Sequence, residues 1–208
     1  MKVAVLGTRG FPGVQGGVEA HCENLYARLA DKDCEITVFS RKPYVGIGIK
    51  TFGAVKLIPL SCPAHKFLEA FWHTFTGIFA AKRIKPDIIH IHAIGPALFI
   101  PLARILGLKV VMTNHGPDYQ RKKWNKFAKA VLRFGECLGS RWANGIICIS
   151  ETIGRDIRRK YRREITVIPN GVAMPKVLES NATVRRFGLS NGKYILAVGR
   201  FVPEKGFH

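Results

Sequence analysis

Short apolar runs alternate along the chain with longer segments in which apolar residues recur every three or four positions. The short runs are typical of strands buried in a parallel sheet, and the longer segments are typical of amphipathic helices. Strands are predicted at residues 2–6, 35–39, 55–58, 88–92, 109–113, 145–149 and 165–168. This alternation predicts an α/β fold with a doubly wound parallel sheet. The glycine-rich residues 45–53 are expected to form a hairpin or loop.

Two of the predicted helices have distinct faces. Residues 122–138 place Lys and Arg along one stripe and apolar side chains opposite, and we expect the apolar side to pack on the sheet. That apolar stripe consists of Trp124, Phe127, Val131, Phe134 and Leu138. In residues 66–83 a phenylalanine recurs at every fourth position, which predicts a core-facing helix, with a groove for a lipid tail as the alternative.

The first predicted strand leads into a glycine-rich loop, residues 7–17. Glycine lets the backbone turn and approach a ligand without a Cβ in the way. A helix is predicted to begin at Gly17, so the amides of Gly16 and Gly17 lie at its positive end and suit a phosphate or diphosphate. The loop is too long for a nicotinamide fingerprint, because roughly ten residues separate strand from helix where that turn is tight.

Composition narrows the class of protein. The 208 residues are 47% hydrophobic, enough for one domain with a fragment of another, and 33 Lys and Arg against 14 Asp and Glu give a net charge of +19. Such a charge implies an anionic partner: a phosphate substrate, a nucleic acid or an acidic membrane. The five cysteines have no paired spacing, which favours a reducing compartment. Without an apolar leader or a membrane-spanning stretch, the sequence predicts a cytoplasmic protein.

Five short motifs follow one another along the chain: GGVE at 16–19, NHG at 114–116, CISE at 148–151, IPNGV at 168–172 and GRFVPEKG at 199–206. Together and in this order they resemble those of family-four retaining glycosyltransferases of the GT-B fold. The opening GTRGFPGVQGGVE looks most like the bacterial branch of rhamnosyl- and related sugar transferases. The resemblance implies a Rossmann-like, acceptor-binding N-terminal domain over residues 1–190. Residues 191–208 would then be the first strand, Tyr194–Val198, and the phosphate loop of an incomplete donor-binding domain.

The resemblance also implies the chemistry. The complete enzyme would transfer a hexosyl-type sugar, with retention, from a nucleotide-diphosphate donor to a lipid-linked or polysaccharide acceptor. It would need no metal and no cofactor, and the present piece would be inactive alone. Gly16, Gly17, Arg200 and Lys205 are expected at the donor diphosphate, where Arg and Lys stabilise the departing charge. His115 is expected against the transferred sugar in a positioning and electrostatic role, with a loop histidine packed under the rim as the alternative.

Four further residues are weaker candidates for acceptor or sugar contacts: Glu19, His92, Asn114 and Ser150. Glu19 equally suits the first turn of a helix, where a carboxylate favours the dipole, and Ser150 equally suits a helix N-cap. His90 and His92 share one face of their strand and would make half a metal site. No third ligand is evident, so no metal is expected.

Four other expectations remain open at this point. An NADP-dependent reductase would use Arg41 for the ribose phosphate and the Tyr119–Lys123 pair, while a basic nucleic-acid-binding module fits the charge but lacks a recognition motif. The basic segments 122–133 and 155–163 suit the anionic inner face of the cell membrane, with an ordinary solvated face as the alternative. Residues after about 190 are expected to be disordered or paired with another molecule, because a lone strand there lacks partners.

Overall fold

The computed structural model describes residues 1–46, 48–65, 68–172, 174, 182–190, 192–199 and 206. The chain separates into two compact units. The first consists of Met1–Gln120 and Trp124–Gly171, and the second of Arg121–Lys123 and Val172–His208. The first unit contains the sheet and the candidate site, and the second contains the short helix α6 (Ala182–Arg186).

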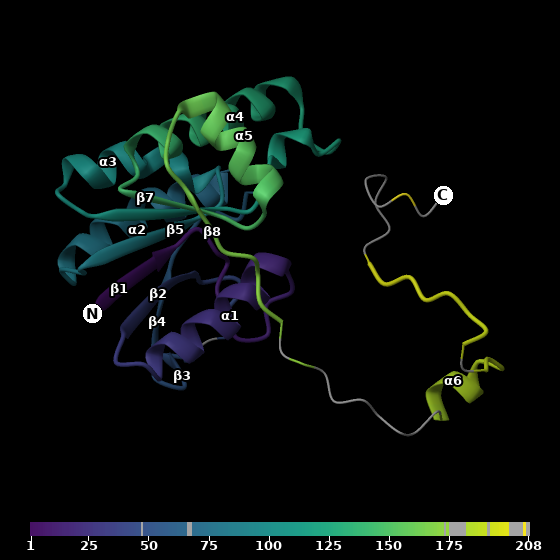
Figure 1. The fold of residues 1–208 in the computed structure, drawn as a ribbon. Coiled ribbons are helices and arrows are strands. Elements are labelled where there is room, and N and C mark those ends of the chain that lie inside the picture. The colour runs from purple at the N-terminus through teal and green to yellow at the C-terminus, as the bar shows by residue number, and fades with distance from the viewer. Residues whose placement is uncertain are drawn as a thin grey trace. The chain divides into compact units, whose positions relative to one another are not determined.

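The first unit is built on one eight-stranded sheet with the order β3-β4-β2-β1-β5-β6-β7-β8 (Figure 1). The strands are β1 (Lys2–Leu6), β2 (Glu35–Arg41), β3 (Thr51–Phe52), β4 (Val55–Leu60), β5 (Ile88–His92), β6 (Val110–Asn114), β7 (Gly145–Cys148) and β8 (Thr166–Val167). Neighbouring strands are parallel except β3 and β4, which are antiparallel. The predicted parallel sheet is therefore confirmed. Residues 45–53, predicted as a hairpin or loop, lead into β3, which forms a hairpin with β4.

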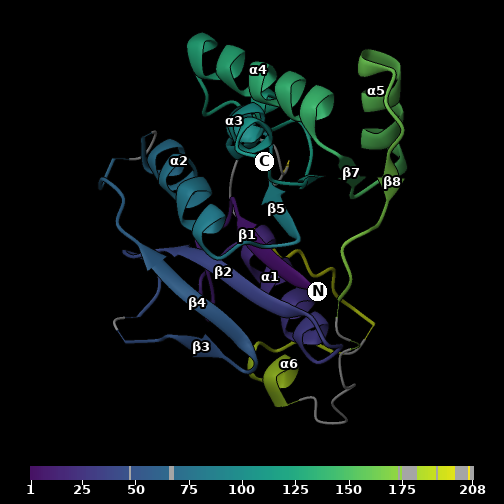
Figure 2. The ribbon, with the colours of Figure 1, turned by 90° about the vertical axis from the view of Figure 1, so that its left-hand side faces the viewer.

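Helices cover both faces of this sheet, as a doubly wound fold requires. They are α1 (Gly17–Ala30), α2 (Leu68–Arg83), α3 (Ile100–Ile105), α4 (Lys126–Trp142) and α5 (Glu151–Tyr161), with 3-10 turns η1 (Pro96–Phe99) and η2 (Asp118–Gln120). Figure 2 shows α1 on one face and α2, α3 and α4 on the other. Two apolar clusters result, one around Tyr26 of α1 and the other around Ile78, Ile91 and Met112. Strand β1, at the centre of the sheet, is therefore covered by helices on both faces.

Helix α4 differs from its prediction in both start and orientation. It begins at Lys126, where the Asn125 side chain accepts a hydrogen bond from the Ala128 amide at 2.8 Å. Its buried side carries Gly135, Glu136, Gly139 and Ser140, whereas Phe127 and Phe134 are 78% and 56% exposed. The two glycines allow this, since a Cβ at Gly135 would collide with the Ile94 carbonyl and one at Gly139 with Met112. The predicted packing of the aromatic stripe on the sheet is wrong.

Aromatic residues also face outward on α2. Trp72, Phe75 and Phe79 are exposed, while the side toward the sheet carries His73, Gly77 and Ile78. Gly77 sits directly against the Leu6 side chain, which leaves no room for a larger residue. The predicted core-facing phenylalanine stripe is therefore wrong for Phe75 and Phe79, and Phe67 lies outside the described residues.

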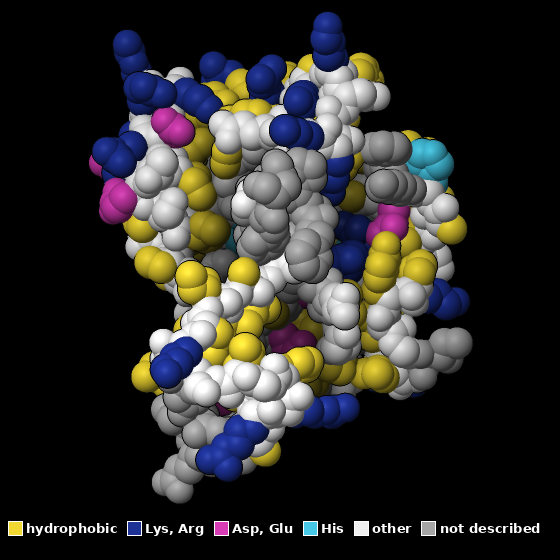
Figure 3. Space-filling view, turned by 90° about the vertical axis from the view of Figure 1, so that its right-hand side faces the viewer, with side chains coloured by type: hydrophobic (Ala, Val, Ile, Leu, Met, Phe, Trp, Pro, Cys, Tyr) yellow, Lys and Arg dark blue, Asp and Glu magenta, His cyan; other side chains and the backbone are white. Residues whose placement is uncertain are grey.

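The surface over α4 and α5 is basic. Figure 3 shows Lys and Arg side chains gathered in the upper part of that view, where these two helices lie. Lys126, Arg133 and Arg141 are exposed on α4, next to the exposed Phe127 and Phe134. On α5 part of the positive charge is compensated, because Arg158 pairs with Glu151 at 3.5 Å and Arg159 with Asp156 at 3.1 Å. Lys122, predicted on the basic stripe, precedes the helix.

In the second unit, Tyr194–Val198 carries no regular secondary structure, so the strand predicted there is not formed. Ile195 is 100% exposed. A strand needs a neighbour for its backbone hydrogen bonds, and no described residue pairs with this segment. Arg200 and Lys205 lie outside the described residues. The domain boundary at residue 190 stays a prediction.

Candidate functional site

The candidate site lies at the carboxyl edge of the sheet, beyond the ends of β1, β5 and β6. The strand order reverses between β1 and β5, and ligands of open α/β sheets bind in the crevice at such a reversal. Gly7 begins the loop after β1 with φ +95°, and a Cβ there would collide with the backbone of His92 at the end of β5. The glycine loop and the histidine-bearing strand end are thus in direct contact.

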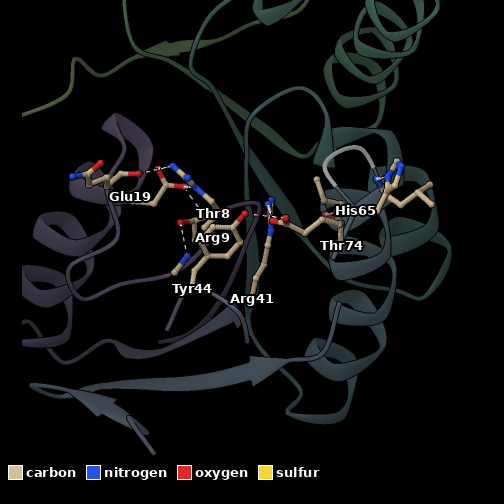
Figure 4. A network of polar contacts seen from close by, with 12 residues as sticks. Thr8, Arg9, Glu19, Arg41, Tyr44, His65 and Thr74 are labelled. Atoms are coloured by element: carbon tan, nitrogen blue, oxygen red, sulfur yellow. Dashed lines mark hydrogen bonds and ion pairs between the residues drawn. The ribbon is translucent and has the colours of Figure 1, made fainter. Parts of the chain in front are cut away.

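The loop is fixed to α1 by a partly buried ion pair (Figure 4). Arg9 Nε donates to Glu19 Oε1 at 3.0 Å, and Arg9 Nη2 donates to Glu19 Oε2 at 3.2 Å. The same guanidinium donates to the Gln15 carbonyl, so both ends of the loop are held. Burial raises the pKa of the Glu19 carboxyl, but its hydrogen bonds with Arg9 outweigh this and leave the pKa below its ordinary value. Glu19 is 7% exposed and paired, which supports its structural role over a substrate contact.

The N-terminus of α1 stays exposed beside this ion pair. Gly16 and Gly17 are exposed, and a Cβ at Gly16 would run into the Glu19 carboxylate, so only glycine lets that carboxylate pack there. Among the described residues, no acceptor is recorded for the Gly17 or Val18 amide. Free amides at a helix N-terminus attract anions. The geometry leaves this end of α1 open to a phosphate group.

A second set of polar contacts lies beside the loop (Figure 4). Arg41, at the end of β2, donates to the Glu69 carboxylate, which also accepts from the Tyr44 hydroxyl at 2.9 Å. The Arg9 guanidinium lies 5.4 Å from the centre of the Tyr44 ring. Because Arg41 is buried and paired with Glu69, it is not available for the ribose phosphate of NADP. The reductase alternative is not supported.

Histidines from three elements meet behind the edge. His92 Nδ1 lies 3.0 Å from His115 Nε2, and His92 Nε2 lies 2.5 Å from the Tyr26 hydroxyl of α1. The same hydroxyl lies 2.8 Å from His90 Nδ1. The His21 ring of α1 lies edge-on to His115, with ring centres 5.6 Å apart. The N-terminal turns of α1 and the His115 loop are therefore neighbours.

These imidazoles are held neutral by their surroundings. Burial, together with the neighbouring His21, lowers the pKa of His115 to about 4, although Glu19 acts in the opposite direction. Burial lowers the pKa of His90 to about 3, and the pKa of His92 lies well below its ordinary value for the same reason. His92 is fully buried with both ring nitrogens in hydrogen bonds, so it lies behind His115 rather than on the surface. A direct substrate contact by His92 is not available in this structure.

Asn114 and Ser150 shape the backbone of the edge. Asn114 Oδ1 accepts from the Gly116 amide at 2.8 Å and so folds the loop that carries His115. Asn114 is fully buried, and its Nδ2 has no partner among the described residues. Ser150 is the N-cap of α5, where its Oγ accepts from the Ile153 amide at 3.3 Å. Both residues lie at the carboxyl edge of the sheet, Asn114 at the end of β6 and Ser150 just after β7.

Further chemistry at this edge is limited. Across the described part of the chain, no group of three or more His, Cys, Asp or Glu side chains is arranged to hold a metal ion. All five cysteines are free thiols. The helices that the structure describes are too short or too polar to cross a bilayer. The Tyr119 hydroxyl, assigned to a reductase dyad in the alternative reading, accepts from Lys160 at 2.9 Å.

Sequence reasoning missed Arg9, His21 and Tyr26. Arg9 lies among glycines and gives no periodic signal, although an Arg ten residues before Glu19 is a candidate partner. Tyr26 follows Cys22 by one helical turn on the buried face of α1. A tyrosine on a buried stripe needs a hydrogen-bond partner for its hydroxyl, and the paired His90 and His92 were the visible candidates.

Comparison with known proteins gives the family. A sequence model described as Glycosyltransferase Family 4 matches residues 15–174, well over half of the chain. The chain is 33% identical over 123 residues to an uncharacterized glycosyltransferase, YqgM, of Bacillus subtilis (strain 168). That match covers 58% of this chain and 33% of the Bacillus protein. The chain therefore spans only part of the length of this relative.

Solved structures agree in fold. The apo form of the lipopolysaccharide outer core galactosyltransferase WaaB has a TM-score of 0.58 at 20% identity, covering 86% of this chain and 48% of WaaB. Sucrose-phosphate synthase from Thermosynechococcus elongatus gives 0.61 at 19%, covering 81% and 47%. The Anabaena protein Alr3699/HepE, solved with UDP and glucose, gives 0.58 at 14%, covering 82% and 44%. The fold is thus that of one half of GT-B glycosyltransferases, and the chain belongs to Glycosyltransferase Family 4.

Proposed function

We propose that this chain is the N-terminal, acceptor-binding part of a glycosyltransferase. The complete enzyme transfers a hexosyl sugar, with retention and without a metal, from a nucleotide-diphosphate donor to a lipid-linked or polysaccharide acceptor. Residues 1–190 form the acceptor domain, and residues 191–208 begin the donor domain, with Arg200 and Lys205 at the diphosphate. The observation that carries this proposal is the meeting of the exposed α1 N-terminus with the His115 loop at one sheet edge, within the matched family region.

In this proposal the N-terminus of α1 binds the negatively charged diphosphate of the donor. The exposed amides after Gly16 point to an anion, and the Arg9–Glu19 pair holds the loop so that these amides keep their place. Electrostatic stabilisation of a departing diphosphate is the main catalytic task of such a transfer. A helix N-terminus, together with Arg200 and Lys205, would supply it without a metal ion.

His115 contacts the transferred sugar in this proposal. Its low pKa makes it a neutral imidazole near pH 7, which suits a hydrogen bond to a sugar oxygen and not an ion pair with the diphosphate. The test uses the full-length protein and a screen of nucleotide-activated hexoses. His115→Ala should lower kcat roughly 100-fold or more, as loss of a transition-state hydrogen bond does.

A matched control is Lys32→Ala, an exposed residue after α1 at the opposite edge of the sheet. That variant should keep full activity. Transfer by His115→Ala at the rate of the unmodified enzyme would remove His115 from the site. Failure of every nucleotide sugar to support transfer would remove the proposed activity altogether.

We further propose that α4 holds the domain on the anionic inner face of the membrane. The exposed Phe127 and Phe134 lie on the same outer surface of α4 as Lys126, Arg133 and Arg141. Exposed aromatic side chains beside cations are typical of helices that lie in the membrane interface. This arrangement favours a membrane contact over an ordinary solvated face, because exposing large apolar side chains to water is unfavourable.

Liposome flotation tests this contact with the full-length protein. Binding to vesicles with anionic lipid should fall at high salt, and Lys126→Glu with Arg133→Glu should weaken it, at about 1 kcal/mol or roughly fivefold for each cation lost. Phe127→Ser with Phe134→Ser should also weaken it. Lys42→Glu with Lys50→Glu removes the same charge elsewhere and should have a smaller effect. Binding that ignores salt and anionic lipid would contradict the proposal.

A further inference from the structure

A continuous hydrogen-bond chain runs from β6 to the His115 loop through the interior of the first unit. Thr113 Oγ1 lies 2.7 Å from His90 Nε2, and His90 Nδ1 lies 2.8 Å from the Tyr26 hydroxyl. The Tyr26 hydroxyl lies 2.5 Å from His92 Nε2, and His92 Nδ1 lies 3.0 Å from His115 Nε2. Three imidazoles, one phenol and one threonine hydroxyl thus share four hydrogen bonds.

Proton counting leaves this chain two favourable arrangements. Each neutral imidazole carries one N–H, so it donates one of its two bonds and accepts the other. The Tyr26 oxygen could accept from both His90 and His92, but the Tyr26 O–H would then lack an acceptor among the described residues, and Tyr26 is fully buried. With that arrangement set aside, a single direction runs through all four bonds. In the first direction Thr113 donates to His90, His90 to Tyr26, Tyr26 to His92, and His92 to His115. In the second every bond is reversed. The first puts the proton of all three imidazoles on Nδ1, and the second puts it on Nε2.

The threonine selects between them. In the first direction the Thr113 hydroxyl hydrogen is used on His90 Nε2. In the second direction that hydrogen needs another acceptor, and for Thr113, which is buried, the described residues provide none. A buried hydroxyl without its hydrogen bond costs about 1–3 kcal/mol. The free end of the chain at His115 has no such requirement, because His115 is only half-buried.

We propose that Thr113, His90, Tyr26 and His92 are positioning residues that fix His115 as a neutral imidazole with its proton on Nδ1. His115 then presents a hydrogen-bond donor, and not an acceptor, on the one nitrogen that the chain leaves free. This inference deepens the proposed function and rests on it, because the N–H of His115 would donate a hydrogen bond to an oxygen of the sugar nucleotide. A donor at this nitrogen cannot act as a general base, so His115 binds and orients an oxygen without taking a proton.

Packing supports a fixed arrangement. The His90 and His92 rings stack with centres 4.3 Å apart, and the His92 and His115 rings stack at 5.3 Å. The Tyr26 ring is fully buried and edge-on to both His90 and His92. His21 lies edge-on to His92 and His115, on the α1 side. The rings therefore have little freedom to turn, and only the protons distinguish the two directions.

Nuclear magnetic resonance of the present chain, labelled with ¹⁵N-histidine, tests the direction without any assay of activity. Long-range ¹H–¹⁵N correlation at neutral pH should show the Nδ1–H form for His90, His92 and His115, each assigned by its His→Gln variant. Thr113→Val should abolish this preference, because it keeps the shape and removes the donor. Thr113→Ser should restore it. Nε2–H forms in the parent protein, or a spectrum of Thr113→Val identical to that of the parent, would overturn the proposal.

Tyr26→Phe provides an independent check, because it removes only the central hydroxyl. In that background Thr113→Val should alter the tautomer of His90 and leave the tautomer of His115 unchanged, because the hydrogen-bond chain is cut between them. A response of His115 to Thr113 without the Tyr26 hydroxyl would show that the coupling runs elsewhere and would overturn the chain. Should Tyr26→Phe not fold, the Thr113→Val and Thr113→Ser pair still decides the outcome.

Kinetics of the full-length enzyme test the positioning role. Tyr26→Phe and Thr113→Val should each lower kcat roughly 10- to 100-fold with a smaller change in donor KM, and Thr113→Ser should recover most of it. In a His115→Ala background, Tyr26→Phe should lower kcat little further. Altered tautomers with unchanged kcat would overturn the positioning role. An enzyme that accepts no nucleotide sugar would instead refute the proposed function, while the tautomer measurements still decide the chain.

Discussion

The close docking of α4 predicts an unusual response to the smallest substitution, glycine to alanine. Alanine in place of a helical glycine normally stabilises a helix by about 0.5–1 kcal/mol. At Gly135 the new methyl group would collide with the Ile94 carbonyl, a backbone atom that cannot rotate away. At Gly139 it would meet the Met112 thioether, which is flexible, and the Ala97 Cβ at 2.8 Å, which cannot turn away. At Gly17, the first residue of α1, it would meet nothing within 4 Å.

The magnitudes follow from these contacts. Forcing a methyl group into a packed core costs typically 1–3 kcal/mol, and the rigid carbonyl places Gly135→Ala at about 3 kcal/mol. Subtracting about 1 kcal/mol of helix propensity leaves a net destabilisation of about 2 kcal/mol. For Gly139→Ala the cost is about 2 kcal/mol, because Met112 can move but Ala97 cannot, so a net destabilisation of about 1 kcal/mol remains. Gly17→Ala should be more stable than the parent chain.

Thermal unfolding followed by circular dichroism measures this order. A change of 1 kcal/mol shifts Tm by about 2–4 °C in a protein of this size, so Gly135→Ala should unfold about 4–8 °C lower. Gly139→Ala should unfold about 2–4 °C lower than the parent, and Gly17→Ala slightly higher. A Gly135→Ala variant as stable as Gly17→Ala would refute the close docking of α4, since the helix would then have room that the structure does not show.

Three further predictions concern single side chains. Glu19→Gln should lower the free energy of unfolding at pH 7 by roughly 1–2 kcal/mol, less than for a fully buried pair because Arg9 is partly exposed. Because the pKa of Glu19 in the folded protein lies below the ordinary 4.5, this stabilisation is complete above pH 4.5 and is lost as the pH falls further. The free energies of unfolding of the parent and of Glu19→Gln, measured by urea titration at each pH, should therefore converge in acid. His73, whose pKa is lowered to about 4 by burial and by Arg41, stays neutral when folded while the unfolded chain binds a proton below about 6.5. Acidification from pH 6.5 to 4 should therefore destabilise the protein, and His73→Leu should reduce the slope by up to about 1.4 kcal/mol per pH unit, whereas an unchanged slope would count against a buried neutral His73. Ser150→Ala should cost about 1 kcal/mol through loss of the α5 cap and Ser150→Asp should not, as equilibrium unfolding of the two variants can establish.

The sequence predicted the sheet well because its strands are buried apolar runs between turn residues. The bounds of β1 and β5 agree with their predictions, and the edge that carries Gly16, His115 and Ser150 follows from the parallel order alone. A parallel strand buried on both faces needs apolar side chains at every position, so its signal depends little on distant contacts. Once the strands are identified as parallel, their carboxyl ends must lie at the same edge of the sheet.

Orientation of the helices was predicted poorly because it depends on which surface fits the sheet. On α4 the bulky Phe127 and Phe134 dominate the apolar pattern, yet Gly135 and Gly139, one turn apart, allow the closer approach and are the buried side. The histidine cluster was visible only in part. The period of two placed His90 and His92 on one face, but their contacts with Tyr26 and His115 arise from elements far apart in sequence.

The origin of the hydrogen-bond chain in separate elements has a consequence for engineering. Tyr26 comes from α1, His90 and His92 from β5, Thr113 from β6 and His115 from the loop that follows it. Transplanting one loop between related enzymes would bring in a new imidazole without the phenol and hydroxyl that orient it. Chimeras of this protein should therefore exchange these five positions as one module, and libraries that randomise a single loop should hold them constant.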